Sequence, residues 1–149
     1  MIVAADTNVF VYAADDRDPA KQTMSRQVFA ALLAAKQPVS LQVVGEFQNV
    51  LRRRLGMPAH LASQQARNLF VAFPTFGYDA ACVDLALAHS AAGRFSYRDA
   101  LLLAACSRAG VEALISEDMQ DGALFAGVRI INPFAQSGLS EPARQVLEV

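Results

Sequence analysis

Short apolar runs alternate with longer helical segments along this chain, and that alternation constrains the fold more than any other feature. The runs are mostly Val, Ile, Leu and Ala, as buried strands are, and cover 2–5, 39–41, 113–115 and 128–131, with 75–76 as a minimal fifth strand. Helical spacing of apolar residues predicts helices after residue 6 and over 20–36, 42–55, 59–71, 79–92, 99–109 and 141–149. Strands alternating with helices predict an α/β sandwich around a mostly parallel sheet.

Length and composition indicate a single compact domain over residues 1–149. Apolar residues make up 54% of the chain and charged residues 18%, which favours a compact globule over a disordered chain. No apolar stretch approaches the roughly 18 residues of a membrane span. The start, MIVAADTN, has no basic leader, so we expect a cytoplasmic protein. Cys82 and Cys106 lie in apolar helical sequence and are expected to be buried thiols.

Four acidic residues stand where predicted strands end or predicted helices begin. Asp6 follows the first strand, and Asp118 follows the strand over 113–115. Asp99 opens an apolar helix, and Glu46 lies about one turn into the helix after the second strand. In an alternating strand–helix protein these positions lie along one rim, outside the carboxyl ends of the strands, where open sheets bind their ligands.

Each acid also has an ordinary structural interpretation. Asp6 stands beside Thr7 at the start of a helix, where short polar side chains cap the chain. Glu46 and Asp99 lie in the first turns of helices, where the dipole favours acids, and Ser96 three residues before Asp99 is a plausible helix cap. Thr7 could instead orient the Asp6 carboxylate in a metal site.

Asp118 belongs to a turn that contains three acids. Asp118 is the preferred site acid because of its distance from the strand, and Asp121 is the second candidate. Whether Asp121 or Glu117 also joins the metal site stays open. The ordinary interpretation is a solvated turn ending in Asp-Gly.

The four acids together are more informative than any one of them. Two like charges 4 Å apart repel by ~4 kcal/mol at an effective dielectric near 20, so four converging carboxylates need a counter-charge. Oxygen ligands without His or Cys suit Mg²⁺ or Mn²⁺ rather than Zn²⁺. Such ions polarise phosphoryl oxygens and activate water. The net charge of −1 neither supports nor excludes a phosphodiester substrate.

The order and spacing of these motifs resemble those of the PIN-domain ribonucleases. The motifs are Asp6-Thr7-Asn8, Glu46-Phe47, Tyr97-Arg98-Asp99-Ala100 and Ser116-Glu117-Asp118, followed by the closing 128–133 segment, VRIINP. The run 116–122, SEDMQDG, is similar to that of VapC-type toxins within the family. The match covers a core of about 2–134 and leaves 135–149 as a C-terminal tail.

The resemblance implies a three-layer α/β/α sandwich with a sheet of about five strands. It implies catalytic roles for Asp6, Glu46, Asp99 and Asp118, with three of them, Asp6, Asp99 and Asp118, binding Mg²⁺ or Mn²⁺. The implied supporting residues are Thr7, Asn8, Ser116 and Asp121.

The implied activity is metal-dependent cleavage of single-stranded RNA, with tRNA a typical class of target. The implied partners are a small VapB-like antitoxin, whose C-terminal segment covers the active groove, and a second copy of the chain. A non-catalytic PIN-like module that binds RNA or protein is the alternative. A phosphorylated receiver domain fits less well, because it needs a Lys near a late strand and the chain has only Lys21 and Lys36.

Two arginine features bear on the substrate. Arg98 stands beside Asp99 where relatives of this type often carry a large aromatic residue; Arg98 either contacts substrate phosphate or pairs with a neighbouring acid. Arg52, Arg53 and Arg54 end a predicted helix, and a solvated helix end that complements its own dipole is favoured over a surface for RNA or antitoxin.

Overall fold

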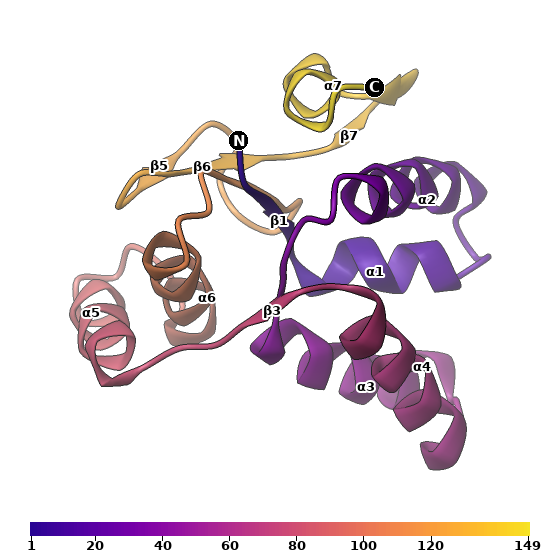
Figure 1. Ribbon diagram of the computed structural model, residues 1–149, viewed down its shortest axis with the longest axis horizontal. Coiled ribbons are helices and arrows are strands. Elements are labelled where there is room, and N and C mark those ends of the chain that lie inside the picture. The colour runs from indigo at the N-terminus through magenta and orange to yellow at the C-terminus, as the bar shows by residue number, and fades with distance from the viewer.

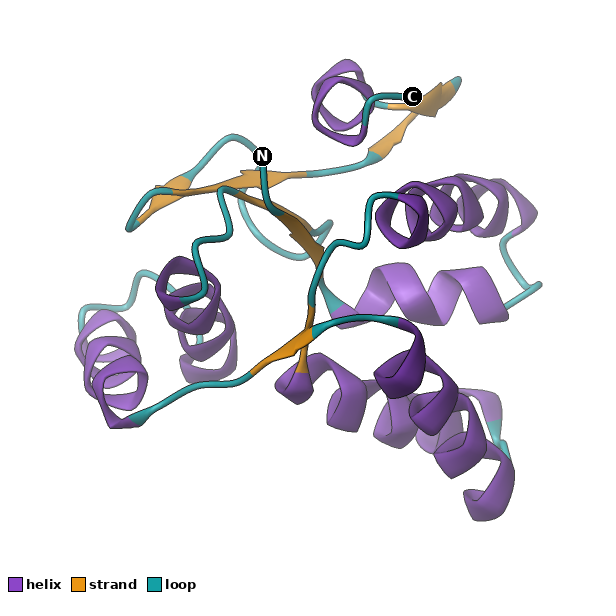
Figure 2. Ribbon diagram, in the orientation of Figure 1, coloured by secondary structure: helices purple, strands orange, loops and turns teal.

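Seven helices surround a short four-stranded sheet in the computed structural model, which describes all residues 1–149 (Figures 1 and 2). The helices are α1 (Thr7–Ala14), α2 (Pro19–Ala34), α3 (Leu41–Leu55), α4 (Ala59–Ala72), α5 (Ala80–Ala91), α6 (Tyr97–Arg108) and α7 (Glu141–Leu147). The strands are β1 (Val3–Ala5), β2 (Val39–Ser40), β3 (Thr75–Phe76), β4 (Ala113–Ile115), β5 (Leu124–Phe125), β6 (Val128–Ile131), β7 (Phe134–Ala135) and β8 (Gly138–Leu139). The predicted helices and strands are therefore all present, with boundaries shifted by one or two residues.

The main sheet has the strand order β1-β4-β6-β5, and its first three strands are parallel. Ala5, Ile115 and Ile131 lie side by side in register, so these three strands end at the same level. The backbone N–H of Asp6 donates to the carbonyl of Ile115 at 2.9 Å, and that of Ser116 donates to Ile131 at 3.0 Å. The residues that follow β1 and β4 are thus fixed next to each other at one rim.

The pairing of the remaining strands differs from the expected sheet of about five. β2 and β3 form a separate parallel pair, in which Val39 and Ser40 face Thr75 and Phe76. β2 lies beside β1, but the two strands are not paired, so the main sheet ends at β1. Ser40 ends β2 and caps α3, because its hydroxyl accepts from the N–H of Gln42 at 3.2 Å.

Two short antiparallel hairpins were not predicted. β5 pairs with β6 through a tight turn in which Ala126 and Gly127 have φ of 47° and 86°. Positive φ at both central positions is the geometry that two-residue hairpins need. The second hairpin, β7–β8, leads into α7.

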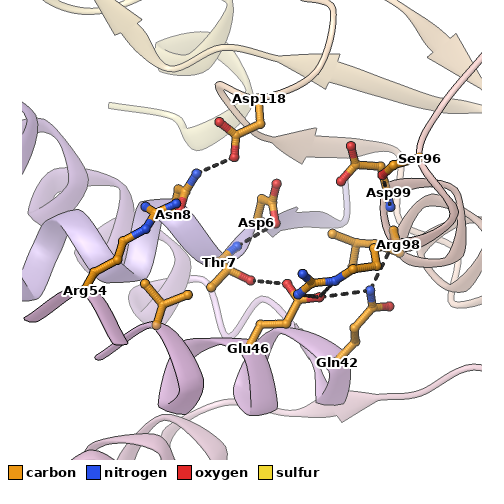
Figure 3. Close-up of a pocket in the computed structure, with 12 residues that line it drawn as sticks. Asp6, Thr7, Asn8, Gln42, Glu46, Arg54, Ser96, Arg98, Asp99 and Asp118 are labelled. Carbon is orange, nitrogen blue, oxygen red and sulfur yellow. Dashed lines mark hydrogen bonds and ion pairs between the residues drawn. The ribbon is translucent and has the colours of Figure 1, made fainter. Parts of the chain in front are cut away.

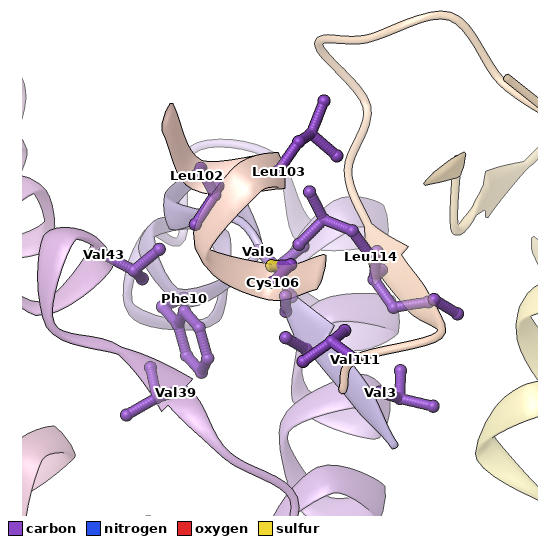
Figure 4. Close-up of a cluster of buried hydrophobic side chains, with 14 of the residues drawn as sticks. Val3, Val9, Phe10, Val39, Val43, Leu102, Leu103, Cys106, Val111 and Leu114 are labelled. Carbon is purple, nitrogen blue, oxygen red and sulfur yellow. The ribbon is translucent and has the colours of Figure 1, made fainter. Parts of the chain in front are cut away.

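The layers follow from where the apolar residues lie. Figure 1 shows α5 and α6 packed together on one side of the sheet, with α7 and α2 beyond the other. Every residue of the run 100–106 in α6 is buried, which confirms the expectation from its apolar sequence. Figure 4 shows Leu103 and Cys106 of α6 in the buried cluster with Val3 and Leu114 of the strands. Cys82 and Cys106 are buried free thiols, as expected.

The C-terminal tail packs against the rest of the domain. Ala143 and Leu147 of α7 belong to the same buried cluster as Val3 and Leu114. α7 and β8 both contact α2. One hydrophobic core therefore extends into the segment 135–149. None of the helices combines the length and the apolar character that crossing a membrane requires.

Candidate active site

The four acids identified from the sequence line one pocket of about 210 Å³, although they come from four separate segments (Figure 3). Asp6 directly follows β1, Glu46 lies on α3, Asp99 lies in the first turn of α6, and Asp118 follows β4. The pocket is strongly polar, with only two apolar residues in its lining. The other lining residues are Thr7, Asn8, Gln42, Val50, Arg54, Ser96, Arg98 and Leu102.

Asp6 lies at the bottom of this pocket and is only 7% exposed. One carboxylate oxygen accepts the backbone N–H of Thr7 at 2.7 Å, and the other accepts the hydroxyl of Ser116 at 3.0 Å. Asp6 itself is therefore the N-cap of α1. Burial, reinforced by the charges of Asp99 and Asp118, raises the pKa of Asp6 to about 6 against the opposing effect of its two hydrogen bonds.

Asp118 is the most exposed of the four acids and is held from two sides. The hydroxyl of Ser116 accepts its backbone N–H at 3.3 Å, and the side-chain amide of Asn8 donates to its carboxylate. Partial burial and the neighbouring Glu117 raise the pKa of Asp118, while Arg54, Asn8 and Lys21 oppose the rise. Ser116 and Asn8, both expected to support the site, thus contact two of its acids directly.

Asp99 faces Asp6 and Asp118 from the start of α6. Ser96 caps this helix, as expected, because its hydroxyl accepts the backbone N–H of Asp99 at 3.2 Å. Burial raises the pKa of Asp99, and the charges of Asp118 and Glu46 add to the rise. The cap therefore fixes the backbone that brings a third acid to the pocket.

Glu46 is the acid with the most hydrogen-bond partners. One carboxylate oxygen accepts from the Thr7 hydroxyl at 2.8 Å. The other accepts from Nε of Arg98 at 3.1 Å and from Gln42 at 3.3 Å, and lies 2.6 Å from Nη2 of Arg98. Of the two expectations for Arg98, the structure shows the ion pair with a neighbouring acid.

The other acids of the 116–122 turn point elsewhere. Glu117 accepts from Lys21 at 2.8 Å and from the Tyr12 hydroxyl, and so ties the turn to α1 and α2. Asp121 accepts the backbone N–H of Asn132 at 2.8 Å. Neither residue lines the pocket, so the structure does not bring the second candidate Asp121 to the other four.

Gln42 and Arg54 are polar pocket residues that the sequence analysis did not assign to the site. Gln42, Glu46, Val50 and Arg54 recur every four residues along α3, which places all four side chains along one face of that helix. This spacing was visible in the sequence, but it becomes a signal only once Glu46 is assigned to the site.

The donor set suits a divalent cation bound by oxygen. The pKa is raised for Asp6, Asp99 and Asp118, chiefly by burial and further by neighbouring carboxylates, and a bound cation would favour their ionised forms. Asp, Glu and Asn oxygens are the ligands that Mg²⁺ and Mn²⁺ prefer. No three acidic, His or Cys side chains lie close enough together to form a finished ligand set. Binding would therefore require side-chain rotation, with Asp118 turning from Asn8 or Glu46 from Arg98.

Comparison with known proteins adds evidence on the fold. No protein-family model and no curated protein matches the sequence. Among solved structures, VapC20 of Mycobacterium tuberculosis, a toxin that cleaves the sarcin–ricin loop, superposes with a TM-score of 0.61 at 19% identity. The match covers 78% of this chain and 89% of VapC20. The chain has the fold of VapC toxins.

A second solved structure supports the same conclusion. A chain of VapBC2 from Rickettsia felis, determined bound to a DNA fragment from the promoter, matches with a TM-score of 0.62 at 14% identity. This match covers 87% of the present chain and 97% of that one. The expected VapC-type α/β fold is thus confirmed, and at these identities the likeness concerns the fold.

Proposed function

We propose that this protein is a divalent-metal-dependent endoribonuclease that acts as the toxin of a toxin–antitoxin pair. The observation that carries the proposal is the convergence of Asp6, Glu46, Asp99 and Asp118 on one polar pocket of a VapC-type fold. A pocket with this lining has little apolar surface for a hydrophobic ligand and many oxygen donors for a cation.

Asp6, Asp99 and Asp118 would hold Mg²⁺ or Mn²⁺, and Glu46 would complete the site directly or through water. The cation would polarise a phosphoryl oxygen, activate the attacking water and stabilise the leaving oxygen. The protein's own contribution is orientation. Ser116 and Thr7 fix the Asp6 carboxylate, and Thr7 also holds Glu46, so two acids from distant segments are positioned by neighbouring residues.

Arg98 would exchange partners when substrate enters. Its guanidinium is largely exposed and bonded to Glu46 at the side of the pocket. Because guanidinium binds phosphate and carboxylate with the same fork geometry, a substrate phosphate can compete with Glu46 for it. Arg98 is therefore proposed to contact the substrate phosphate, with Glu46 released toward the cation.

RNA is the proposed substrate, and an antitoxin and a second copy of the chain are the proposed partners. The Mycobacterium tuberculosis neighbour is a toxin that cleaves the sarcin–ricin loop, which supports RNA as the substrate class. tRNA remains the expected target from the family resemblance. The Rickettsia felis neighbour comes from a VapBC complex, which supports a VapB-like partner.

The direct test is RNA cleavage by the purified chain with Mg²⁺ and with EDTA. We expect endonucleolytic products with Mg²⁺, none with EDTA, and none from Asp99→Asn, which removes one charge and keeps the shape of the side chain. Asp16→Asn, at an exposed loop position, is the matched control and should cut at the parent rate. Cleavage by Asp99→Asn at the parent rate would refute the site, and RNA binding without cleavage by the parent would favour the non-catalytic alternative.

A further inference from the structure

Part of the pocket wall, at Val50 and Arg54, comes from a stretch of the chain that carries no negative charge. Between Phe47 and Tyr78, which spans the second half of α3 and all of α4, there is no Asp or Glu. The same stretch contains Arg52, Arg53 and Arg54 in a row, in a protein whose net charge is only −1. This end of α3 is therefore a local positive region beside a pocket of carboxylates.

The three arginines form no ion pair within the protein, although the charge of Arg54 lowers the pKa of Asp118. Four other arginines do form ion pairs with acids: Arg17, Arg98, Arg108 and Arg144. Arg52, Arg53 and Arg54 form none, and all three are exposed. A helix C-terminus favours basic residues in its last turn, but this effect alone does not require them to line a pocket.

The directions of these side chains are specific. Arg54 lines the acid pocket, where Figure 3 shows it reaching toward Asn8. Arg52 and Arg53 line a second depression of about 380 Å³ at the same end of α3, together with Asn49 and Met57. Consecutive helical residues are about 100° apart, so the three guanidinium groups fan around the end of α3, starting at the acid pocket.

We propose that Arg52, Arg53 and Arg54 bind successive phosphates of one RNA strand and lead that strand out of the acid pocket around the C-terminal end of α3. This inference rests on the proposed function, because it names the path of the same substrate. Arg54 would bind the phosphate next to the one that is cleaved, and Arg53 and Arg52 would bind phosphates farther along.

The chemistry of the side chains fits a phosphate backbone. Guanidinium groups bind phosphate through two parallel hydrogen bonds, and they lose less hydration than ammonium groups do. Contacts to phosphate position a strand without reading its bases. The three arginines should therefore set affinity and direction, while base preference comes from other parts of the protein.

The test measures RNA binding in the Asp99→Asn background with Mg²⁺, so that the RNA is not cut. Arg52→Gln/Arg53→Gln is compared with Lys36→Gln/Arg129→Gln, which makes the same change in net charge at exposed positions without an ion pair. Fluorescence anisotropy of labelled oligouridylate and oligoadenylate across a salt series gives the affinity and its salt dependence. Each phosphate contact to a single strand contributes about 0.7 to the slope of log affinity against log salt.

We expect the Arg52/Arg53 variant to lose about 1.4 from that slope, equally on both oligonucleotides, and the control to keep the parent slope. The proposed RNA path would be overturned if the Arg52/Arg53 variant binds as well as the Asp99→Asn protein, or if the control loses as much. This holds even if the chain with Asp99 intact cleaves RNA. Loss of RNA binding in the Arg52/Arg53 variant would support the proposed RNA path. If the chain with Asp99 intact also binds RNA but never cleaves it, the path stands and the nuclease is refuted. A parent that binds no RNA would overturn both.

Discussion

The buried charge of Asp6 leads to a stability prediction with a definite sign. A pKa raised from 3.8 to about 6 means that ionisation of this carboxyl costs the folded state about 3 kcal/mol once the pH exceeds both values. Asp6→Asn removes the charge and keeps the shape, and its carbonyl can still accept from Thr7 while its amide donates to Ser116. In EDTA near neutral pH we expect this variant to be more stable than the parent by about 3 kcal/mol, or about 6–12 °C in melting temperature.

The pH dependence separates this cause from ordinary repacking. The folded state binds more protons than the unfolded state between the unfolded pKa of 3.8 and the folded pKa of about 6, so the stability of the parent falls as pH rises through this window. Asp6→Asn has no such group to titrate. The difference between the two proteins should therefore be small near pH 4 and reach its full size above about pH 6.

Thermal unfolding in EDTA over this pH range provides the measurement, with the exposed Asp16→Asn as control. Mg²⁺ should stabilise the parent and reduce the gap, because a bound cation replaces the missing counter-charge. A variant that is less stable than the parent at neutral pH, or a gap that does not change with pH, would refute the reasoning.

Two further outcomes follow from the packing and the ion pairs. Arg98→Gln frees Glu46 from its counter-charge, so calorimetry should show Mn²⁺ binding tightened about twofold to fivefold, the range expected of an exposed ion pair. Unchanged or weaker binding would contradict a competition between Arg98 and the cation. Leu103→Ala, at a fully buried position of α6, should lower the free energy of unfolding by about 2–5 kcal/mol. Leu87→Ala, on the exposed side of α5, should change it by less than about 0.5 kcal/mol. Equal effects in urea unfolding would contradict the assignment of the core.

The position of the acids could be predicted because it follows from strand topology. Asp6 and Asp118 come after strands that turned out to be parallel neighbours ending at one level, so their convergence needed only the alternation of strands and helices. Asp99 was singled out because it opens an apolar helix, and the cap at Ser96, offered as its ordinary interpretation, is present as well. Glu46 is the only acid between Asp18 and Asp79, so a carboxylate from this segment had to be Glu46, and it lines the pocket.

What could not be predicted depends on contacts between distant residues. The 116–122 turn contains three acids, and only folding decides that Glu117 turns to Lys21 while Asp121 turns to the backbone of Asn132. The hairpin strands β5, β7 and β8 have two residues each, and their pairing depends on turns that the apolar pattern does not reveal. Arg54 was assigned to a solvated helix end on the basis of the helix dipole. Its alignment with Glu46 gains meaning only when α3 is known to line the site.

The central claim, that these carboxylates gather to hold a divalent cation, is tested most directly by titrating the protein with Mn²⁺ and counting bound ions by calorimetry or electron paramagnetic resonance. The account predicts saturable uptake by the parent, loss of that uptake in Asp6→Asn and Asp99→Asn, and parent-like uptake in Asp16→Asn. Absence of uptake by the parent, or equal uptake by all four proteins, would contradict it.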